Sequence, residues 1–341
     1  MSTDAPGVIF QTRRRRDRGG SPSCCARSRH PFDRRRVSPN ERIRIALVGV
    51  GIRGQQDLRS ALRTPGVELA AAADVYDGRL TLAKERVGQP ACSRRATTAR
   101  CWRGRDVDAV IIATPDHWHA QMAVDAMKAG KDVYVEKPMV QAARRRAADR
   151  STRRVRPDAS CRSAASTPAP SSTRRRRELF RAGAIGELNL VEAWINRNSS
   201  MGAWQYSIPP DASPQTIDWD RFLGRAPKRP FDPVRLFRWR NYRDYGTGIP
   251  GDLFVHLFTG IHFVLDALGP TRAIASGGLR HWNDGRDVPD VMLALYDYPK
   301  TAIASGVHLV AEGELRRRRR RRARVPLRRA RRRAHDWRQR R

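Results

Sequence analysis

The chain has 341 residues, of which 40% are hydrophobic, which suits a soluble protein with two domains that each bury a core. Its formal net charge of +34 is far from that of an ordinary enzyme and, taken alone, indicates a nucleic-acid or anionic-surface partner. No apolar run reaches the length of a membrane span, so we expect no membrane partner.

The positive charge is distributed unevenly. All six lysines lie in segments with hydrophobic periodicity, whereas many arginines crowd into four lysine-free stretches that show neither helical nor strand periodicity: 11–36, 91–105, 142–177 and 316–341. Three interpretations remain open: nucleic-acid-binding arms, low-complexity tails, or out-of-frame translation of a GC-rich gene. The lack of lysine favours the third, because natural basic arms mix both residue types and rarely interrupt a folded domain.

The N-terminus and the cysteines carry little functional signal. Residues 1–40 form a basic segment that we expect to be disordered, and they lack the apolar core of a secretory signal. We therefore expect a cytoplasmic chain, although an out-of-frame reading of this segment would leave room for a lost export signal. The five cysteines form no C-x-x-C pair and no zinc spacing, so we expect no metal.

The first patterned segment, "RIRIALVGVGIRGQQDLRSAL", predicts a strand, a glycine turn and a helix. In this context Gly49, Gly51 and Gly54 form a G-x-G-x-x-G motif. The first glycine permits the tight turn, the second lets the backbone approach a pyrophosphate, and the third lets the helix pack closely on the strand. The helix N-terminus offers free N–H groups to the phosphates, and Arg53 could add a charge there.

A second buried strand is predicted over residues 67–73, in "VELAAAADVYD". Asp74 ends it, 20 residues after Gly54, where a carboxylate would accept the ribose hydroxyls of a dinucleotide and repel a 2′-phosphate. The sequence therefore favours NAD over NADP as the cofactor. The alternative is that Asp74 merely ends the strand and caps the turn that follows.

The segment "DVDAVIIATPDHWHAQMAVDAMKAGKDVYVEKP" predicts a further strand–helix–strand unit. Residues 107–113 form an apolar run typical of a central parallel strand, Gly130 suits the end of the helix, and residues 133–135 form the next strand. Ligands in open α/β sheets bind beyond the carboxyl ends of the strands. The positions that share such ends are Gly49, Asp74, Thr114-Pro115 and Glu136-Lys137-Pro138.

After the gap, residues 188–195 predict a strand that opens a second domain. The loop "FLGRAPKRPFDPVRLFRWRNYRDYGTGIPGD" could line a carbohydrate pocket, and its candidates for substrate contact are Trp239, Arg240 and Tyr242. The next segment, 251–269, is apolar nearly all round and predicts a buried helix. Asp252 and His256 stand four residues apart on it and should face the same way, as a buried acid–base pair.

The glycine turn, "ATPDHWH" and above all "VEKP" resemble the Gfo/Idh/MocA oxidoreductases over about two-thirds of the chain. The resemblance implies a Rossmann-type doubly wound parallel sheet, followed by an α/β domain with an open, mainly antiparallel sheet that mediates homo-oligomerisation. It places Lys137 beside the nicotinamide and the reacting hydroxyl, makes His256 the base, and makes Asp252 the residue that orients substrate and histidine. The cofactor contacts expected in all are Gly49, Gly51, Ile52, Arg53, Gly54, Asp74, Thr114, Pro115, His119 and Glu136.

His117 and His262 have no such match, and we expect both to be packing residues. Where the family often has an aspartate three residues after its histidine, this chain has Thr259, which leaves the partner of His256 open. The expected reaction is hydride transfer between a nicotinamide and a hydroxyl carbon of a sugar or polyol, as a net oxidation, reduction, epimerisation or glycoside cleavage. The alternatives are a basic nucleic-acid-binding protein or an inactive frame-shifted relative.

These expectations divide the chain into five parts. They are a basic N-terminal segment, a Rossmann domain, an anomalous linker, a truncated C-terminal α/β domain and a disordered tail, over residues 1–40, 41–141, 142–177, 178–311 and 312–341. We expect no strand in the arginine-rich stretches, and hence a damaged copy of the family architecture.

Overall fold

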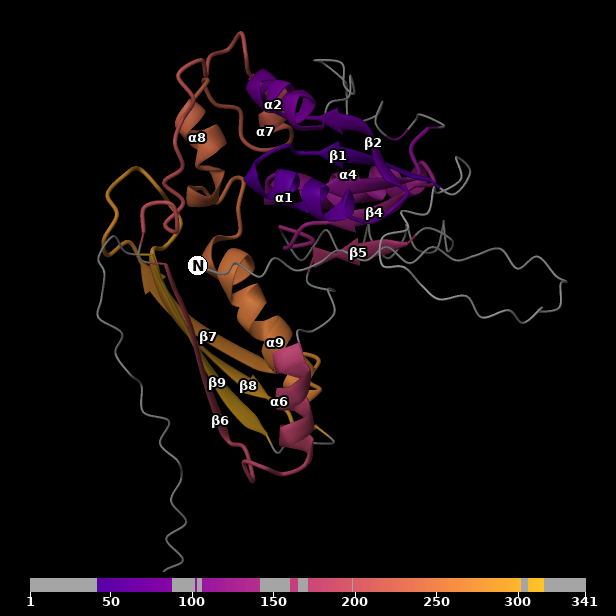
Figure 1. Cartoon of the computed structure of the whole chain (residues 1–341). Coiled ribbons are helices and arrows are strands. Elements are labelled where there is room, and N and C mark those ends of the chain that lie inside the picture. Colours follow the sequence, from indigo (N-terminus) through magenta and orange to yellow (C-terminus); the bar gives the residue numbers. More distant parts are fainter. Residues whose placement is uncertain are drawn as a thin grey trace, which may run out of the picture.

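The computed structural model describes residues 42–87, 102, 106–141, 160–164, 171–197, 199–301 and 306–315. The expected N-terminal segment, nearly all of residues 91–105 and the tail from residue 316 lie outside these residues, as does much of the linker. Figure 1 shows two layered domains, one around a parallel sheet and one around a second sheet that carries its helices on the side of the first domain.

The first domain is built on a five-stranded parallel sheet with the order β2-β1-β3-β4-β5. The apolar runs predicted as strands form its centre, where both faces are covered and near-continuous hydrophobicity is required. The strands are β1 (Ile43–Val48), β2 (Val67–Ala73), β3 (Ala109–Ile112), β4 (Asp132–Val135) and β5 (Cys161–Ser163).

Helices cover both faces of this sheet. Alternate residues of the strands pack against α1 (Ile52–Ala61) and α2 (Asp77–Val87) on one face and against α4 (Asp116–Lys128) on the other. Gly130, just beyond α4, has a φ of 80°, which agrees with its predicted role at the helix end. The expected doubly wound parallel sheet is therefore confirmed.

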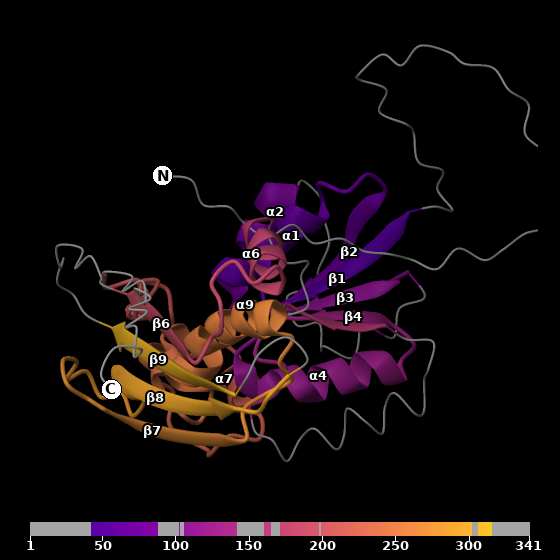
Figure 2. The ribbon, with the colours of Figure 1, turned by 90° about the horizontal axis from the view of Figure 1, so that it is seen from below.

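The second domain contains a mixed four-stranded sheet with the order β6-β9-β8-β7, in which β6 and β9 run parallel and the other pairs antiparallel. Its strands are β6 (Leu190–Arg197), β7 (Arg272–Gly278), β8 (Val291–Tyr298) and β9 (Val307–Leu315). Helices α6 (Ser171–Arg181) and α9 (Val255–Leu265) lie on the same face of the sheet (Figures 1 and 2). The expected mainly antiparallel sheet is thus confirmed.

The opposite face of this sheet is exposed and carries large apolar side chains among polar ones. In the part of the chain that the structure describes, no helix packs on it, as Figure 2 shows from below. The large side chains exposed on β6, β7 and β8 include Trp194, Ile274, Leu293 and Leu295.

Two expectations about the arginine-rich stretches are wrong. β5 and the first seven residues of α6 lie inside residues 142–177, and β9 runs past residue 311, the expected end of the C-terminal domain, to Leu315. β5 has no apolar alternation because it is a short strand that pairs only with β4, through the backbone. α6 contains a run of arginines, which are good helix formers, and it packs through Phe180.

A long connection, residues 199–254, carries the short helices α7 (Trp219–Leu223) and α8 (Pro233–Phe237), a 3₁₀ turn, η4 (Trp239–Asn241), and a π-helical turn, η5 (Pro250–Phe254). An aromatic cluster holds this connection over the end of β2, where Tyr76 forms a β-bridge with Ile217. The connection is thereby fixed above the carboxyl ends of the Rossmann strands.

Candidate active site

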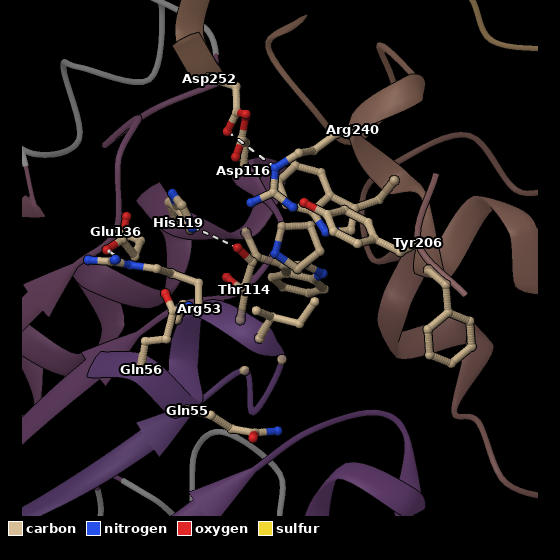
Figure 3. A pocket seen from close by; sticks show the side chains of 18 of the residues that line it. Arg53, Gln55, Gln56, Thr114, Asp116, His119, Glu136, Tyr206, Arg240 and Asp252 are labelled. Carbon is tan, nitrogen blue, oxygen red and sulfur yellow. Dashed lines mark hydrogen bonds and ion pairs between the residues drawn. The ribbon is translucent and has the colours of Figure 1, made fainter. Parts of the chain in front are cut away.

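A cleft of about 1850 Å³ lies between the carboxyl ends of the Rossmann strands, the long connection and α9. Figure 3 shows side chains from both domains pointing into it. The predicted site residues that line it are Gly49, Gly51, Ile52, Arg53, Asp74, Thr114, Pro115, His119, Glu136, Lys137, Trp239, Arg240, Asp252 and His256.

The glycine turn has the geometry that its motif predicts. Gly49 has a φ of +88°, and a Cβ there would lie 2.6 Å from the backbone of Ala113. A Cβ on Gly54 would lie 2.0 Å from the carbonyl oxygen of Gly49, so this glycine serves helix packing and does not line the cleft. Ile52, in the first turn of α1, is 60% exposed at the cleft.

Asp74 links the end of β2 to the glycine turn. Its carboxylate is 3% exposed and accepts hydrogen bonds from the backbone N–H of Val50 at 2.7 Å and of Tyr76 at 3.0 Å. The Arg79 guanidinium lies 3.6 Å away and also lines the cleft. Asp74 therefore caps the turn, as the alternative interpretation held, while it also faces the space where a ligand would lie.

Arg53 does not leave its charge free for a phosphate, contrary to expectation. Its guanidinium contacts the Glu136 carboxylate at 2.6 Å (Figure 3). It also contacts the Asp57 carboxylate at 2.9 Å. Both acids are buried, and burial together with Glu136 raises the pKa of Asp57 well above its usual range. The arginine thus joins α1 to the turn after β4, and only the three-dimensional fold brings it to Glu136.

Lys137 lies at the end of β4 and contacts the second domain. Its Nζ donates hydrogen bonds of 2.8 Å to the Asp252 carboxylate and 2.8 Å to the Asp252 carbonyl oxygen. Arg240 donates to the same carboxylate oxygen from Nε at 3.2 Å, as Figure 3 shows. Burial opposes ionisation of Asp252, but Arg240 and Lys137 outweigh it and hold its pKa below the usual range.

His256 occupies the first turn of α9 and is exposed along the cleft. Although the residue is exposed, the cleft walls remove enough water from the ring to lower its pKa from 6.5. The charges of Lys137 and Arg197 act in the same direction, and Asp252 opposes them. The imidazole is therefore neutral near pH 7, as a proton acceptor must be.

The predicted buried pair of Asp252 and His256 is wrong in two respects. Asp252 is buried at 6% exposure, but His256 is exposed, and in the described part of the chain Asp252 bonds to Lys137 and Arg240 rather than to His256. The reason is local: Asp252 lies in a π-helical turn, where hydrogen bonds run to the fifth residue, so residues four apart do not superimpose as on an α-helix.

A buried acid that sequence reasoning missed, Asp116, lies beside Asp252 in Figure 3. Its Oδ2 accepts hydrogen bonds from the backbone N–H of Thr247 at 3.0 Å and from the Thr247 hydroxyl at 2.7 Å. Burial is the main cause that raises its pKa to about 6. The available signal was its position in the first turn of a helix that follows a strand end.

The two histidines of "ATPDHWH", His117 and His119, and His262 on α9 all have structural contacts. His119 is buried, with Nδ1 2.7 Å from the Pro138 carbonyl oxygen and Nε2 2.8 Å from the Thr114 carbonyl oxygen, so it braces two strand-end loops while lining the cleft. His117 is buried with Nε2 2.8 Å from the Phe222 carbonyl oxygen, which agrees with a packing role. His262 lies on α9 with Nε2 2.7 Å from the Tyr298 hydroxyl, which also agrees with a packing role.

Only two of the three residues predicted to contact the substrate line the cleft. Trp239 and Arg240 line the cleft, and the Arg240 guanidinium stacks 4.1 Å from the centroid of the Trp239 ring. Tyr242 does not line it: the residue is 4% exposed in the aromatic cluster, with Arg235 over its ring at 4.2 Å. The prediction for Tyr242 was wrong because a loop pattern rich in aromatic residues does not tell which rings face inward.

Within the described residues, no group of three His, Cys, Asp or Glu side chains is placed to hold a metal ion. Among the helices of these described residues, none has the length and apolar character that crossing a membrane requires.

Two family descriptions match the chain. Residues 43–156 match "Oxidoreductase family, NAD-binding Rossmann fold" of the Gfo/Idh/MocA group, and residues 198–274 match its "C-terminal alpha/beta domain". The first match covers the glycine turn, Asp74 and Lys137, and the second covers Asp252 and His256.

Among curated proteins, the chain is 33% identical over 106 residues to an alpha-N-acetylgalactosaminidase from Shewanella oneidensis. It is 36% identical over 108 residues to a glycosyl hydrolase family 109 protein from Shewanella baltica strain OS155. The matches cover 29% and 28% of this chain, and the chain spans only 23% of the length of either relative.

Among solved structures, the chain resembles a myo-inositol 2-dehydrogenase from Lactobacillus plantarum, with a TM-score of 0.60, 18% identity, and 81% and 71% of the two chains covered. An apo scyllo-inositol dehydrogenase from Lactobacillus casei gives 0.59, 19%, and 81% and 69%. GenD2 from gentamicin A biosynthesis, in complex with NAD, gives 0.58, 18%, and 80% and 66%. At such identities the likeness shows the fold, which agrees with the two-domain architecture described above. On the family matches and this fold, the chain belongs to the Gfo/Idh/MocA family of oxidoreductases, with an NAD-binding Rossmann domain followed by a C-terminal α/β domain.

Proposed function

We propose that this chain transfers a hydride between NAD and a hydroxyl-bearing carbon of a sugar or polyol. The proposal rests on one contact between the two domains. Lys137, at the end of β4, donates a hydrogen bond to Asp252, which lies about one π-helical turn before His256. A cation, a carboxylate held ionised and a neutral imidazole in one cleft are the groups that alcohol oxidation requires.

The proposed roles follow from the protonation states. His256, neutral because its pKa is lowered, accepts the substrate hydroxyl proton at a ring nitrogen. Lys137 donates to the substrate oxygen and stabilises its developing negative charge. Asp252 acts through Lys137 by holding its ammonium in place at 2.8 Å. In the reverse direction a hydride reduces the ketone, and the protonated imidazole of His256 returns the proton to the alkoxide oxygen.

The residues of the cleft fit a nicotinamide dinucleotide. Gly51 lines the cleft, and the nearest atom to a Cβ there would be in the Arg79 side chain at 3.6 Å, so a pyrophosphate can approach the backbone at this glycine. Thr114 lines the cleft, and its hydroxyl is buried without a hydrogen-bond partner among the described residues. When bound, the cofactor supplies the hydride acceptor.

We propose NAD rather than NADP as the preferred cofactor. Each oxygen of Asp74 accepts one backbone N–H and keeps lone pairs for ribose hydroxyls, and its negative charge repels a 2′-phosphate. Arg79, 3.6 Å away, offsets part of that repulsion. Fluorescence titration with NADH and NADPH tests the assignment, and a preference for NADPH would overturn it.

The function itself is tested by a turnover screen. The full chain is incubated with NAD and a panel of sugars and polyols while absorbance at the NADH band is followed. We expect activity that His256→Asn abolishes while NADH binding remains. Full activity of this variant would remove His256 from the mechanism.

A second candidate is glycoside cleavage by the same hydride chemistry. It is favoured by the similarity of 106 residues to an alpha-N-acetylgalactosaminidase, although the chain spans only 23% of that protein. Release of p-nitrophenol from p-nitrophenyl α-N-acetylgalactosaminide that depends on NAD and on Lys137 would support it. Oxidation of free polyols without such release would favour the dehydrogenase.

We also propose that the chain forms homo-oligomers. The exposed face of the second sheet supports this, because it carries several large exposed apolar side chains, and such side chains together mark association surfaces: Trp194, Ile274, Leu293 and Leu295. Light scattering after size-exclusion chromatography tests it. Trp194→Glu should shift an oligomer toward monomer, and a wild-type monomer would refute the proposal.

A further inference from the structure

Arg197 has an unusual position at the end of β6. Side chains alternate between the two faces of a strand, and Val191, Ala193 and Ile195 pack toward the core under α9. Arg197 continues this inward-facing row and lines the cleft. A cation on the core side of a strand requires a partner, because desolvation of an unpaired charge is costly.

The described residues do not provide that partner. Arg197 makes no ion pair or side-chain hydrogen bond with them, whereas each other described cation that lines the cleft has a carboxylate. These cations are Arg53 with Glu136 and Asp57, Arg79 with Asp74, Arg221 with Asp218, and both Lys137 and Arg240 with Asp252.

The charge near His256 is therefore positive in excess. Asp252 is shared by Lys137 and Arg240, and Asp116, whose pKa of about 6 leaves it mostly ionised near pH 7, lies in the same cleft. These four groups together are close to neutral, and Arg197 adds one positive charge to them. The charge of Arg197 also acts on His256, because it helps to lower the pKa of the imidazole. A neutral polyol would leave this excess uncompensated.

We propose that Arg197 binds an anionic group of the substrate, so that the substrate is a sugar or polyol bearing a carboxylate or a phosphate ester. This inference rests on the proposed function, because it assigns a substrate class to the same cleft. The guanidinium presents a planar fork of donors that matches either anion, and charge-assisted pairs of this kind are among the strong ones. The cleft has room for the group, since its walls enclose about 1850 Å³.

The proposal predicts a difference in affinity that a direct binding measurement can detect. Glucuronate, glucose 6-phosphate and glucose are titrated into the full chain at physiological ionic strength by calorimetry, with and without saturating NADH. The acid or the phosphate ester should bind at least about tenfold more tightly than glucose, the scale of one hydrogen bond to a charged group. Which of the two binds more tightly distinguishes a sugar acid from a sugar phosphate.

Variants distinguish anion binding at Arg197 from non-specific attraction of anions to the positively charged chain. Arg197→Gln should remove most of the preference, and Arg197→Lys should retain part of it. Arg272→Gln is the matched control, because Arg272 is an exposed arginine of the same sheet that pairs with Asp297 and does not line the cleft. Equal affinities for all three probes, or a preference that survives Arg197→Gln, would overturn the proposal.

NADH fluorescence, measured on the same samples, keeps the two proposals apart. Loss of anion preference in Arg197→Gln with NADH binding intact supports the substrate assignment. Absence of NADH binding would defeat the proposed function, while the comparison of glucuronate, glucose 6-phosphate and glucose would still decide the role of Arg197.

Discussion

Replacing Lys137 with alanine tests the chemistry most directly. The ammonium lies 2.8 Å from the Asp252 carboxylate, with side-chain exposures of 14% and 8%. Its interaction with the substrate oxygen should strengthen as negative charge develops, so its loss should act on kcat. We expect turnover to fall roughly 10²-fold, or about 2.7 kcal/mol in activation free energy at 1.36 kcal/mol per tenfold. NADH affinity should change little, because the glycine turn and Asp74 hold the other end of the cofactor.

The same variant should lose stability, with a defined pH dependence. In this variant Asp252 keeps its contact with Arg240 at 3.2 Å. The free energy of unfolding should therefore fall by roughly 1–3 kcal/mol, less than the 3–5 kcal/mol that is typical when a buried charge loses its partner. A carboxylate with a depressed folded pKa contributes stability above its unfolded pKa and loses it as pH falls. The difference in melting temperature between wild type and Lys137→Ala should therefore be largest near neutral pH and shrink in acid.

The assay combines steady-state kinetics, NADH fluorescence titration and thermal melts of the full chain. Lys137→Arg keeps the charge and should keep more of the stability than of the turnover. Lys128→Ala, at an exposed position at the end of α4, is the matched control and should leave all three measurements unchanged. Retained turnover together with weakened NADH binding would make Lys137 a cofactor anchor and refute the catalytic role.

Three further predictions concern the glycine turn, the base and the buried acid. Gly49→Ala should weaken NADH binding and lower the melting temperature, because its Cβ would lie 2.6 Å from the backbone at a φ of +88°. Alcohol oxidation should show an acidic limb with a midpoint below pH 6.5, since His256 must be neutral to accept a proton and its pKa is lowered; a midpoint above that value in the kcat/KM profile would contradict the assignment. Asp116 has a folded pKa raised to about 6, so its stability contribution is full below the unfolded pKa and is lost as pH rises through 6. Asp116→Asn should therefore remove about 2 kcal/mol of the stability change between pH 4 and 6 in denaturant titrations, and an unchanged pH profile would refute it.

The sequence predicted the Rossmann domain well because its signals are local. An apolar run of four or more residues is a buried strand when a turn and a helical period follow it, and β1 with α1 meets this condition. The carboxyl ends of parallel strands then share one edge, so Gly49, Asp74 and Lys137 could be placed together before any contact was known.

Predictions failed where the outcome depends on distant contacts. Arg53 follows the glycine turn, but its partner Glu136 is 83 residues away and decides that its charge is not free. Tyr242 and Trp239 are three residues apart in one aromatic loop, and only packing of the loop on β2 sends one ring into the core and the other to the cleft. The π-helical turn at Asp252 is likewise invisible to a period of 3.6 residues.

The site also depends on how the two domains dock, because Lys137 comes from the first domain and Asp252 comes from the second. Lys137 and Asp252 are 115 residues apart, and three further links close the same interface: Thr247 to Asp116, Phe222 to His117, and the bridge between Tyr76 and Ile217. Each link joins a Rossmann strand end or helix start to the long connection. The segments on either side of residues 142–177 are therefore joined into one structural unit. Because Lys137 from the first domain helps to keep Asp252 ionised, the acid–base chemistry that we propose for the second domain requires the two domains to be docked.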